Sequence, residues 1–286
     1  MNTLVLRQSK AKLQPTRDKL VKDIVVPGPF ASLKRFVPLL VPLAILSFWQ
    51  AASSGGALSS TILPAPLDVA RAFLRLLFSG ELAENAAISF LRAISGLLVG
   101  GTIAFSLGLS NGLSRLSAQA TDTTIQMIRN IPNLALIPLV ILWFGIGEGA
   151  KLFLVSLGVF FPIYINTFHG IRTVDPQLLE MARSYGYRGF SLFWYVILPG
   201  ALPSIFVGLR YALGIMWLTL IVAETIAAQS GLGYMAMSAR EFMQTDVVVL
   251  AILIYASLGK VADLLVRLFE SLTLSWHPAY AKGVRV

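Results

Sequence analysis

The stretch PSIFVGLRYALGIMWLTLIVAETIAA, residues 203–228, decides the fold class. It runs for 26 residues and contains only two charged side chains, those of Arg210 and Glu224. A helix needs about 20 mostly apolar residues to cross the hydrocarbon core of a bilayer. The stretch is therefore predicted to be a membrane-spanning helix.

The composition of the whole chain points to the same environment. Of its 286 residues, 56% are hydrophobic and only 13% are charged, whereas soluble domains usually carry about 25% charged residues. A water-soluble protein of this size could not bury so much apolar surface. The chain has no cysteine, which excludes disulfides and thiolate metal sites.

Five more stretches are long and apolar enough to be membrane spans: 36–52, 91–112, 131–147, 151–171 and 248–268. Pro132 and Pro138 interrupt the third of the six spans, although neighbouring helices can satisfy the backbone groups that a proline frees. The sequence thus predicts an all-α integral membrane protein with about six transmembrane helices. We expect a basic tail at 1–35 and a transmembrane domain at 36–286, with its core at about 84–270.

The distribution of lysine and arginine predicts the orientation, because cytoplasmic loops are enriched in both. With a cytoplasmic N-terminus, the cytoplasmic segments hold 16 of the 23 basic residues and the external loops hold four. Both termini and the loop at 172–202 are then cytoplasmic. The basic tail, which contributes to the net charge of +9, is expected either to bind anionic lipid or to enforce this topology. The first apolar run lacks a cleavage site and is predicted to stay as a helix.

The cytoplasmic loop at 173–202 is the most informative part of the sequence. Asp175, followed by proline, has the residues of a helix start, and Gly186 is predicted to end that helix. A second amphipathic helix is predicted from Phe190 and to end at Pro199. Two short helices at the membrane surface offer a compact projection to a partner. On these residues alone, an interfacial helix pair that only caps the bundle is the alternative.

The spacing in this loop resembles the signature EAA…G…I.LP of ABC importer permeases. Seven positions carry the resemblance, with the second and fifth as mild departures: Glu180, Met181, Ala182, Gly186, Val196, Leu198 and Pro199. Nearly the whole chain from about residue 38 to 280 also resembles the permeases of bacterial aliphatic sulfonate importers. Stretches that carry this likeness include TIQMIRNIPNLALIPLVILWFGIG at 124–147 and AREFMQTDVVV at 239–249.

The resemblance implies a multi-pass permease of the binding-protein-dependent, type I class in the bacterial inner membrane. Its partners would be a second permease chain, two ATP-binding subunits that grip the loop at 173–202, and a periplasmic solute-binding protein. It implies import of aliphatic sulfonates, with taurine, nitrate or a related small anion as the alternative. No nucleic acid partner is expected.

The chain is not expected to be an enzyme or to bind a cofactor. Gly259-Lys260 lacks the earlier glycine and the following Ser or Thr of a phosphate-binding loop, so ATP and Mg²⁺ are expected on the partner subunit. With two histidines and no cysteine, no metal site is predicted.

Two alternatives of a different class are a self-contained channel or secondary transporter and a membrane scaffold that transports nothing. A secondary transporter predicts inverted sequence repeats, and none is found. Neither a channel nor a scaffold has a use for the signature at 173–202.

Ionisable residues within a membrane span are costly and suggest a function. Arg210, Lys260 and Asp263 are predicted to form an ion-paired cluster between the fifth and sixth spans. Arg92 and Glu224 are expected to extend to the external interface, with a role for Glu224 in an external gate or docking surface as the alternative. Candidates for the transport path or for a polar network inside the membrane are Asn166, Thr167, His169, Arg210, Trp217, Thr219, Glu224, Lys260 and Asp263.

Glycines predict close helix packing. Gly96 and Gly100 form a GxxxG pattern that Gly108 continues, and Gly208 and Gly214 lie in the fifth span. Small residues let membrane helices approach closely. The pattern fits packing within the bundle and contact with a second chain equally well.

Overall fold

The computed structural model describes residues 37–55, 59 and 62–276, so the predicted basic tail at 1–35 lies outside the described residues. The chain divides into two units, Met1–Leu58 and Ser59–Val286. In the first unit, the described residues form helix α3 (Val37–Ser54), which contains Pro42. This helix coincides with the first predicted span.

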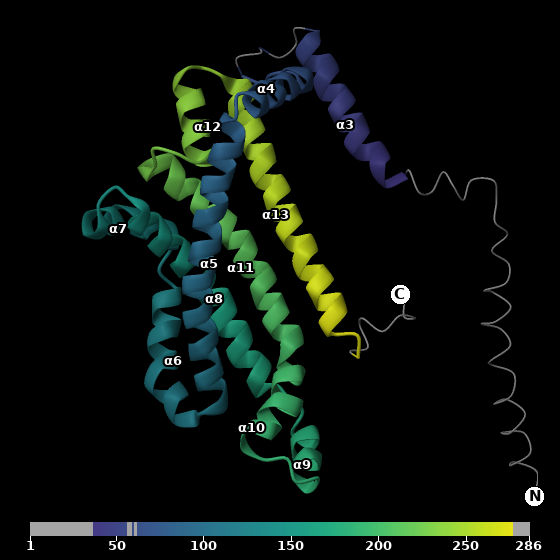
Figure 1. Cartoon of the computed structure of the whole chain (residues 1–286), viewed down its shortest axis with the longest axis vertical. Coiled ribbons are helices and arrows are strands. Elements are labelled where there is room, and N and C mark those ends of the chain that lie inside the picture. Colours follow the sequence, from purple (N-terminus) through teal and green to yellow (C-terminus); the bar gives the residue numbers. More distant parts are fainter. Residues whose placement is uncertain (1–36, 56–58, 60–61, 277–286) are drawn as a thin grey trace, which may run out of the picture. The chain divides into compact units, whose positions relative to one another are not determined.

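The second unit is helical throughout its described part (Figure 1). Its long helices are α5 (Glu81–Leu113), α8 (Glu148–Arg172), α11 (Leu198–Ala227) and α13 (Thr245–Thr273). The shorter elements are α4 (Pro66–Phe78), α6 (Arg115–Arg129), the 3₁₀ turn η2 (Asn133–Leu136), α7 (Ile137–Phe144), α9 (Pro176–Ser184), α10 (Gly189–Leu192), the π-helical turn η3 (Phe193–Ile197) and α12 (Leu232–Glu241).

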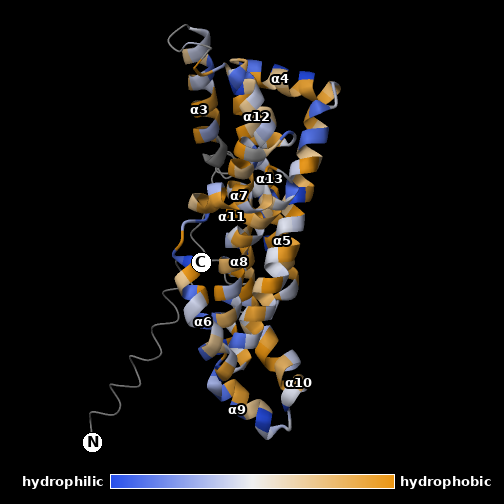
Figure 2. Ribbon diagram, turned by 90° about the vertical axis from the view of Figure 1, so that its left-hand side faces the viewer, coloured by the Kyte–Doolittle hydropathy of each residue, from blue (hydrophilic) through white to orange (hydrophobic). Residues whose placement is uncertain are grey.

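Four of the described helices are long and apolar enough to cross a membrane: α5, α8, the continuous helix from Gly189 to Ile226, and α13. In Figure 2 hydrophobic residues dominate the middle of these helices, whereas α4 and α9 show hydrophilic and hydrophobic residues side by side. A bent helix pair would add a fifth span, and α3 is a shorter apolar helix. This count is close to the six helices that the sequence predicts.

The prediction of a single span at 131–147 is wrong. The segment holds only η2 and the eight-residue α7, and the pair formed by Arg115–Arg129 with Asn133–Phe144 is bent by 84°. Pro132 cannot donate a helical hydrogen bond and disfavours helical backbone at the residue before it. Gly145, with φ of +73°, ends α7 after two turns. The apolar residues of this segment therefore form the second helix of a bent pair, and not a straight span.

Glycines let α5 approach α8. A Cβ atom added to Gly100 would lie 2.2 Å from the carbonyl oxygen of Ser156, and one added to Gly108 would lie 2.9 Å from that of Tyr164. Gly208 of α11 faces α8 in the same way, since an added Cβ would lie 2.8 Å from the Pro162 carbonyl. These glycines therefore serve packing within the chain, which the sequence pattern alone left open.

Candidate functional site

The seven signature residues lie in one corner of the second unit, at the opposite end from α4 (Figure 1). The side chain of Asp175 caps α9 by accepting a hydrogen bond from the backbone N–H of Gln177 at 2.8 Å. Gly186 has φ of +89° and follows the helix end at Ser184. This backbone conformation is strained for residues with a side chain. The helix start and stop are those that the sequence predicts.

The prediction that a second short helix ends at Pro199 is wrong. From Gly189 the chain passes through α10 and the π turn η3 directly into α11, and Gly189–Ile226 forms one helix of 38 residues. Pro199 falls in the first turn of α11, where its missing N–H costs little. The signature corner is therefore helically continuous with a membrane-length helix.

Large apolar side chains are exposed at this corner. Tyr185 is 78% exposed and Phe190 76%, and the ring of Phe190 stacks on that of Trp194 with 6.0 Å between centroids. An exposed group of apolar side chains on a loop commonly marks a contact with another protein. Among the signature residues, Glu180 and Met181 are exposed and Ala182 is buried on α9, which packs against η3. Val196 lies in η3, and Leu198 and Pro199 begin α11.

A second polar site lies in the half of the second unit that is nearer α4. Arg92 of α5 is only 8% exposed and Glu224 of α11 only 1%, and an Nη1–Oε1 distance of 2.8 Å joins them. The expectation that both side chains extend to the interface is therefore wrong. Two charges can be buried at tolerable cost when they pair and have further hydrogen bonds, and hydropathy along the chain does not reveal such a partner.

Two charged residues of α8 join this ion pair, and the four charges together sum to zero. Arg92 donates to both carboxylate oxygens of Glu148, at 2.7 and 2.6 Å. The buried Lys151, the first residue of the span predicted at 151–171, donates to Glu148 at 2.8 Å. We call Arg92, Glu148, Lys151 and Glu224 the four-charge network.

Neutral donors saturate the Glu224 carboxylate. The Ser89 hydroxyl lies 2.8 Å from it, the Tyr255 hydroxyl 2.7 Å and the backbone N–H of Gly233 2.9 Å. The network thereby joins α5, α8, α11, α12 and α13. Gly231 is needed beside it, because its φ is +106° and a Cβ there would lie 2.5 Å from Glu224 Oε1.

The structure brings Arg210, Lys260 and Asp263 together on α11 and α13. Asp263 lies 3.5 Å from Arg210 Nε and 3.7 Å from Lys260 Nζ. It also lies 2.9 Å from Arg267, and Arg210 pairs with Glu270. Sequence reasoning missed these last two residues, although the spacings Asp263 to Arg267 and Asp263 to Glu270 place them on the same helix face.

The neutral candidates are scattered. His169 is exposed in the last turn of α8, whereas Thr167 is buried and its hydroxyl has no hydrogen-bond partner among the described residues. The same holds for the indole N–H of the buried Trp217, and Thr219 is buried beside Gly158. Asn166 is different, because it lines a cavity of about 440 Å³ with Arg129, Asn133 and Tyr211.

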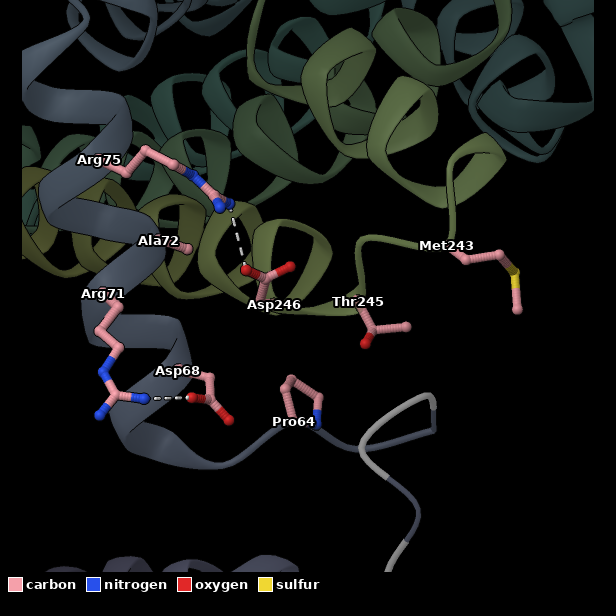
Figure 3. Close-up of a pocket in the computed structure, with 8 residues that line it drawn as sticks. All are labelled: Pro64, Asp68, Arg71, Ala72, Arg75, Met243, Thr245 and Asp246. Atoms are coloured by element: carbon pink, nitrogen blue, oxygen red, sulfur yellow. Dashed lines mark hydrogen bonds and ion pairs between the residues drawn. The ribbon is translucent and has the colours of Figure 1, made fainter.

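A hollow of about 590 Å³ lies between α4 and the start of α13 (Figure 3). Arg71 pairs with Asp68 at 3.0 Å, and Arg75 of α4 reaches Asp246 of α13 at 3.3 Å. Helix α4 falls outside the six spans that the sequence predicts. Its signal was the amphipathic spacing of Val69, Ala72 and Leu76, which are buried on one face.

Comparison with known proteins identifies the family. Residues 96–274 match the family described as "Binding-protein-dependent transport system inner membrane component". This range includes the signature corner, Glu148, Glu224 and the Arg210 cluster.

Three relatives are similar over most of their length. The permease protein SsuC of Escherichia coli (strain K12), assigned to aliphatic sulfonates transport, is 62% identical, with 87% of this chain and 94% of the relative covered. SsuC of Bacillus subtilis (strain 168) is 45% identical, with coverage of 85% and 88%. The taurine transport system permease protein TauC of Escherichia coli is 34% identical, with coverage of 82% and 86%. The chain therefore belongs to the family of binding-protein-dependent transport system inner membrane components, which are transport permeases that work with an ATPase and a binding protein.

Proposed function

We propose that this chain is the membrane-spanning permease of an ATP-driven importer of aliphatic sulfonates. The sequence identities favour sulfonates as the substrate, because the chain is 62% and 45% identical to two SsuC proteins and only 34% identical to TauC. The signature corner supports the mode of transport, because a partner that moves α9 also moves the helix Gly189–Ile226.

We further propose the assembly. Two permease chains would associate with two ATP-binding subunits, which bind ATP and Mg²⁺ and contact the signature corner. The exposed rings of Tyr185 and Phe190 support this contact, since aromatic side chains are enriched where proteins bind each other.

The proposed orientation places α9 and both chain termini on the cytoplasmic side. The end with α4 and α12 then faces the periplasm, where the binding protein would dock over the hollow of Figure 3. Paired charges such as Arg75 and Asp246 there suit a transient, polar contact.

The test is ATP hydrolysis in proteoliposomes that contain the chain with its ATP-binding subunits and binding protein. Ethanesulfonate, taurine and nitrate are compared in the wild type and in Gly186→Asp. Aspartate is strained at the φ of +89° of Gly186, so the variant is expected to lose stimulation by ethanesulfonate. Gly147→Asp is the control, because Gly147 has extended backbone and open space around a Cβ.

Each outcome bears on a separate part of the proposal. Stimulation by taurine or nitrate but not by ethanesulfonate would keep the importer and correct its substrate. Failure of the chain to associate with any ATP-binding subunit would overturn the mode of transport. Full stimulation of Gly186→Asp would remove the signature corner from the coupling.

A further inference from the structure

The bend between α6 and η2 places an exposed basic side chain, that of Arg129, on the lining of a cavity beside α8 and α11. Arg129 ends α6, just before the span predicted at 131–147. In the structure it lines the 440 Å³ cavity together with Phe161 and Asn166 of α8 and Tyr211 of α11. Tyr211 and Asn166 lie within two membrane-length helices. Arg129 thus borders the same cavity as residues of predicted membrane spans, where a charge suggests a function.

We propose that this cavity binds the sulfonate group of the substrate through Arg129, with Asn133, Asn166 and Tyr211 as neutral donors. The proposal rests on the function proposed above and names the substrate contacts of this chain. We call the cavity the Arg129 cavity.

The charge of Arg129 is available to a ligand. Within the described part of the chain no carboxylate lies in salt-bridge distance of it, whereas Arg92 and Arg210 each pair with two carboxylates. A guanidinium presents a planar fork of N–H donors that matches a group with two or three equivalent oxygens. A sulfonate is such a group and is an anion at every physiological pH.

The remaining polar groups supply donors without charge. Asn166 uses one amide N–H on the Pro162 carbonyl at 2.8 Å, which leaves its second N–H for a ligand. The Tyr211 hydroxyl and the Asn133 amide make no hydrogen bond to a described residue. One cation among neutral donors binds an anion without the deep positive well that would prevent its release.

The other wall of the Arg129 cavity is apolar. Phe161, Ile165 and Ile215 contribute side chains to it. Its volume of about 440 Å³ falls in the usual range for small-molecule sites, roughly 300–1,000 Å³. An aliphatic sulfonate has a short alkyl chain next to its anionic group, so it could contact the apolar and the polar wall at once. Nitrate has no alkyl chain.

The test uses the absence of cysteine from the chain. Ile131 lines the cavity and is 43% exposed, so Ile131→Cys places a thiol there. The probes are two methanethiosulfonates, one carrying an ethylsulfonate and one carrying an ethyltrimethylammonium group. Leu116→Cys is the control, since Leu116 is 77% exposed on the same helix as Arg129, about 20 Å away at 1.5 Å per residue.

In the assembled complex, the sulfonate reagent is expected to label Ile131→Cys roughly tenfold more slowly when Arg129→Gln is added, the effect of losing one charge-assisted hydrogen bond. The cationic reagent should not slow, and Leu116→Cys should be unaffected. Ethanesulfonate should protect the thiol at position 131 only. Equal sulfonate labelling with and without Arg129, or no protection, would overturn the proposal. Protection by phosphatidylglycerol vesicles in place of ethanesulfonate would assign the cavity to a lipid headgroup and overturn it as well.

Uptake separates this proposal from the proposed function. If wild-type proteoliposomes take up ethanesulfonate, Arg129→Gln should raise its KM roughly tenfold, and Arg129→Lys should lie between the two. ATP hydrolysis stimulated by the binding protein should persist in both variants. Unchanged uptake in Arg129→Gln would overturn the Arg129 site alone. No uptake by the wild type would overturn the proposed substrate, while the labelling result still decides whether the cavity binds a sulfonate.

Discussion

Arg92 is the residue on which the polar contacts of the four-charge network converge. Its guanidinium donates to Glu148, to Glu224 and to the backbone and hydroxyl oxygens of Ser230. The side chain of Glu224 is fully buried, so water cannot replace this partner. The pair is therefore a point at which one substitution leaves an uncompensated buried charge.

Arg92→Ala is expected to destabilise the permease by about 3–5 kcal/mol, the usual cost of removing one member of a buried pair. Thermal unfolding of the purified protein in detergent measures it. Adding Glu224→Gln should restore part of the loss, because the remaining buried group is then neutral. Arg71→Ala is the matched control: its pair with Asp68 is exposed and contributes about 0–1 kcal/mol. Equal losses in Arg92→Ala and Arg71→Ala would contradict the burial argument.

The helices themselves meet through glycine. Gly100 and Gly214 form a natural comparison, because both lie within membrane-length helices. A Cβ on Gly100 would meet the Ser156 carbonyl of α8, whereas one on Gly214 would meet nothing within 4 Å. The same added methyl group should therefore have opposite effects at the two positions.

Gly100→Ala is expected to lower the free energy of unfolding by about 1–3 kcal/mol through overpacking. Gly214→Ala should leave it unchanged or raise it by up to about 1 kcal/mol, since alanine favours a helix over glycine. Denaturation of both variants in the same detergent tests this. A loss at Gly214 as large as that at Gly100 would show that the α5–α8 approach is not the cause.

Hydropathy predicted the long apolar stretches of α5, α8, α11 and α13. Hydropathy failed at 131–147, because an average over a window of residues cannot show the 84° bend between Arg115–Arg129 and Asn133–Phe144. It failed at Arg92 and Glu224, because depth along a span does not say which neighbour a side chain faces. Spacing did better at Asp175 and Gly186, where the residue types themselves determine the backbone. The Arg129 cavity could not be predicted from the sequence, because its lining residues come together only through this bend.

Over the whole second unit, the helix Gly189–Ile226 connects the signature corner to the four-charge network. It has 38 residues, which at 1.5 Å per residue is about 57 Å, longer than the roughly 30 Å hydrocarbon core. Glu224, two residues before its end, contacts Tyr255 of α13 and Gly233 of α12. A displacement of α9 can therefore reach the opposite end through one rigid element.

Inserting two glycines after Pro199 is expected to abolish stimulation of ATP hydrolysis by the binding protein. The reason is that the flexible insertion interrupts the helix near the start of α11 while α9, the contact proposed for the ATP-binding subunit, is left unchanged. Co-purification with the ATP-binding subunit should persist. The same insertion after Gly147, in the extended turn before α8, serves as the control. Retained stimulation with the insertion after Pro199 would contradict transmission through this helix.

The charge balance of the four-charge network has a consequence for its own response to voltage. Its two cations and two anions sum to zero, so a membrane potential exerts no net force on it as a body. A lone Glu224 would have experienced about 2.3 kcal/mol per 100 mV if it crossed the whole field. A movement of these four residues together across the membrane field would therefore cost the same with and without a membrane potential.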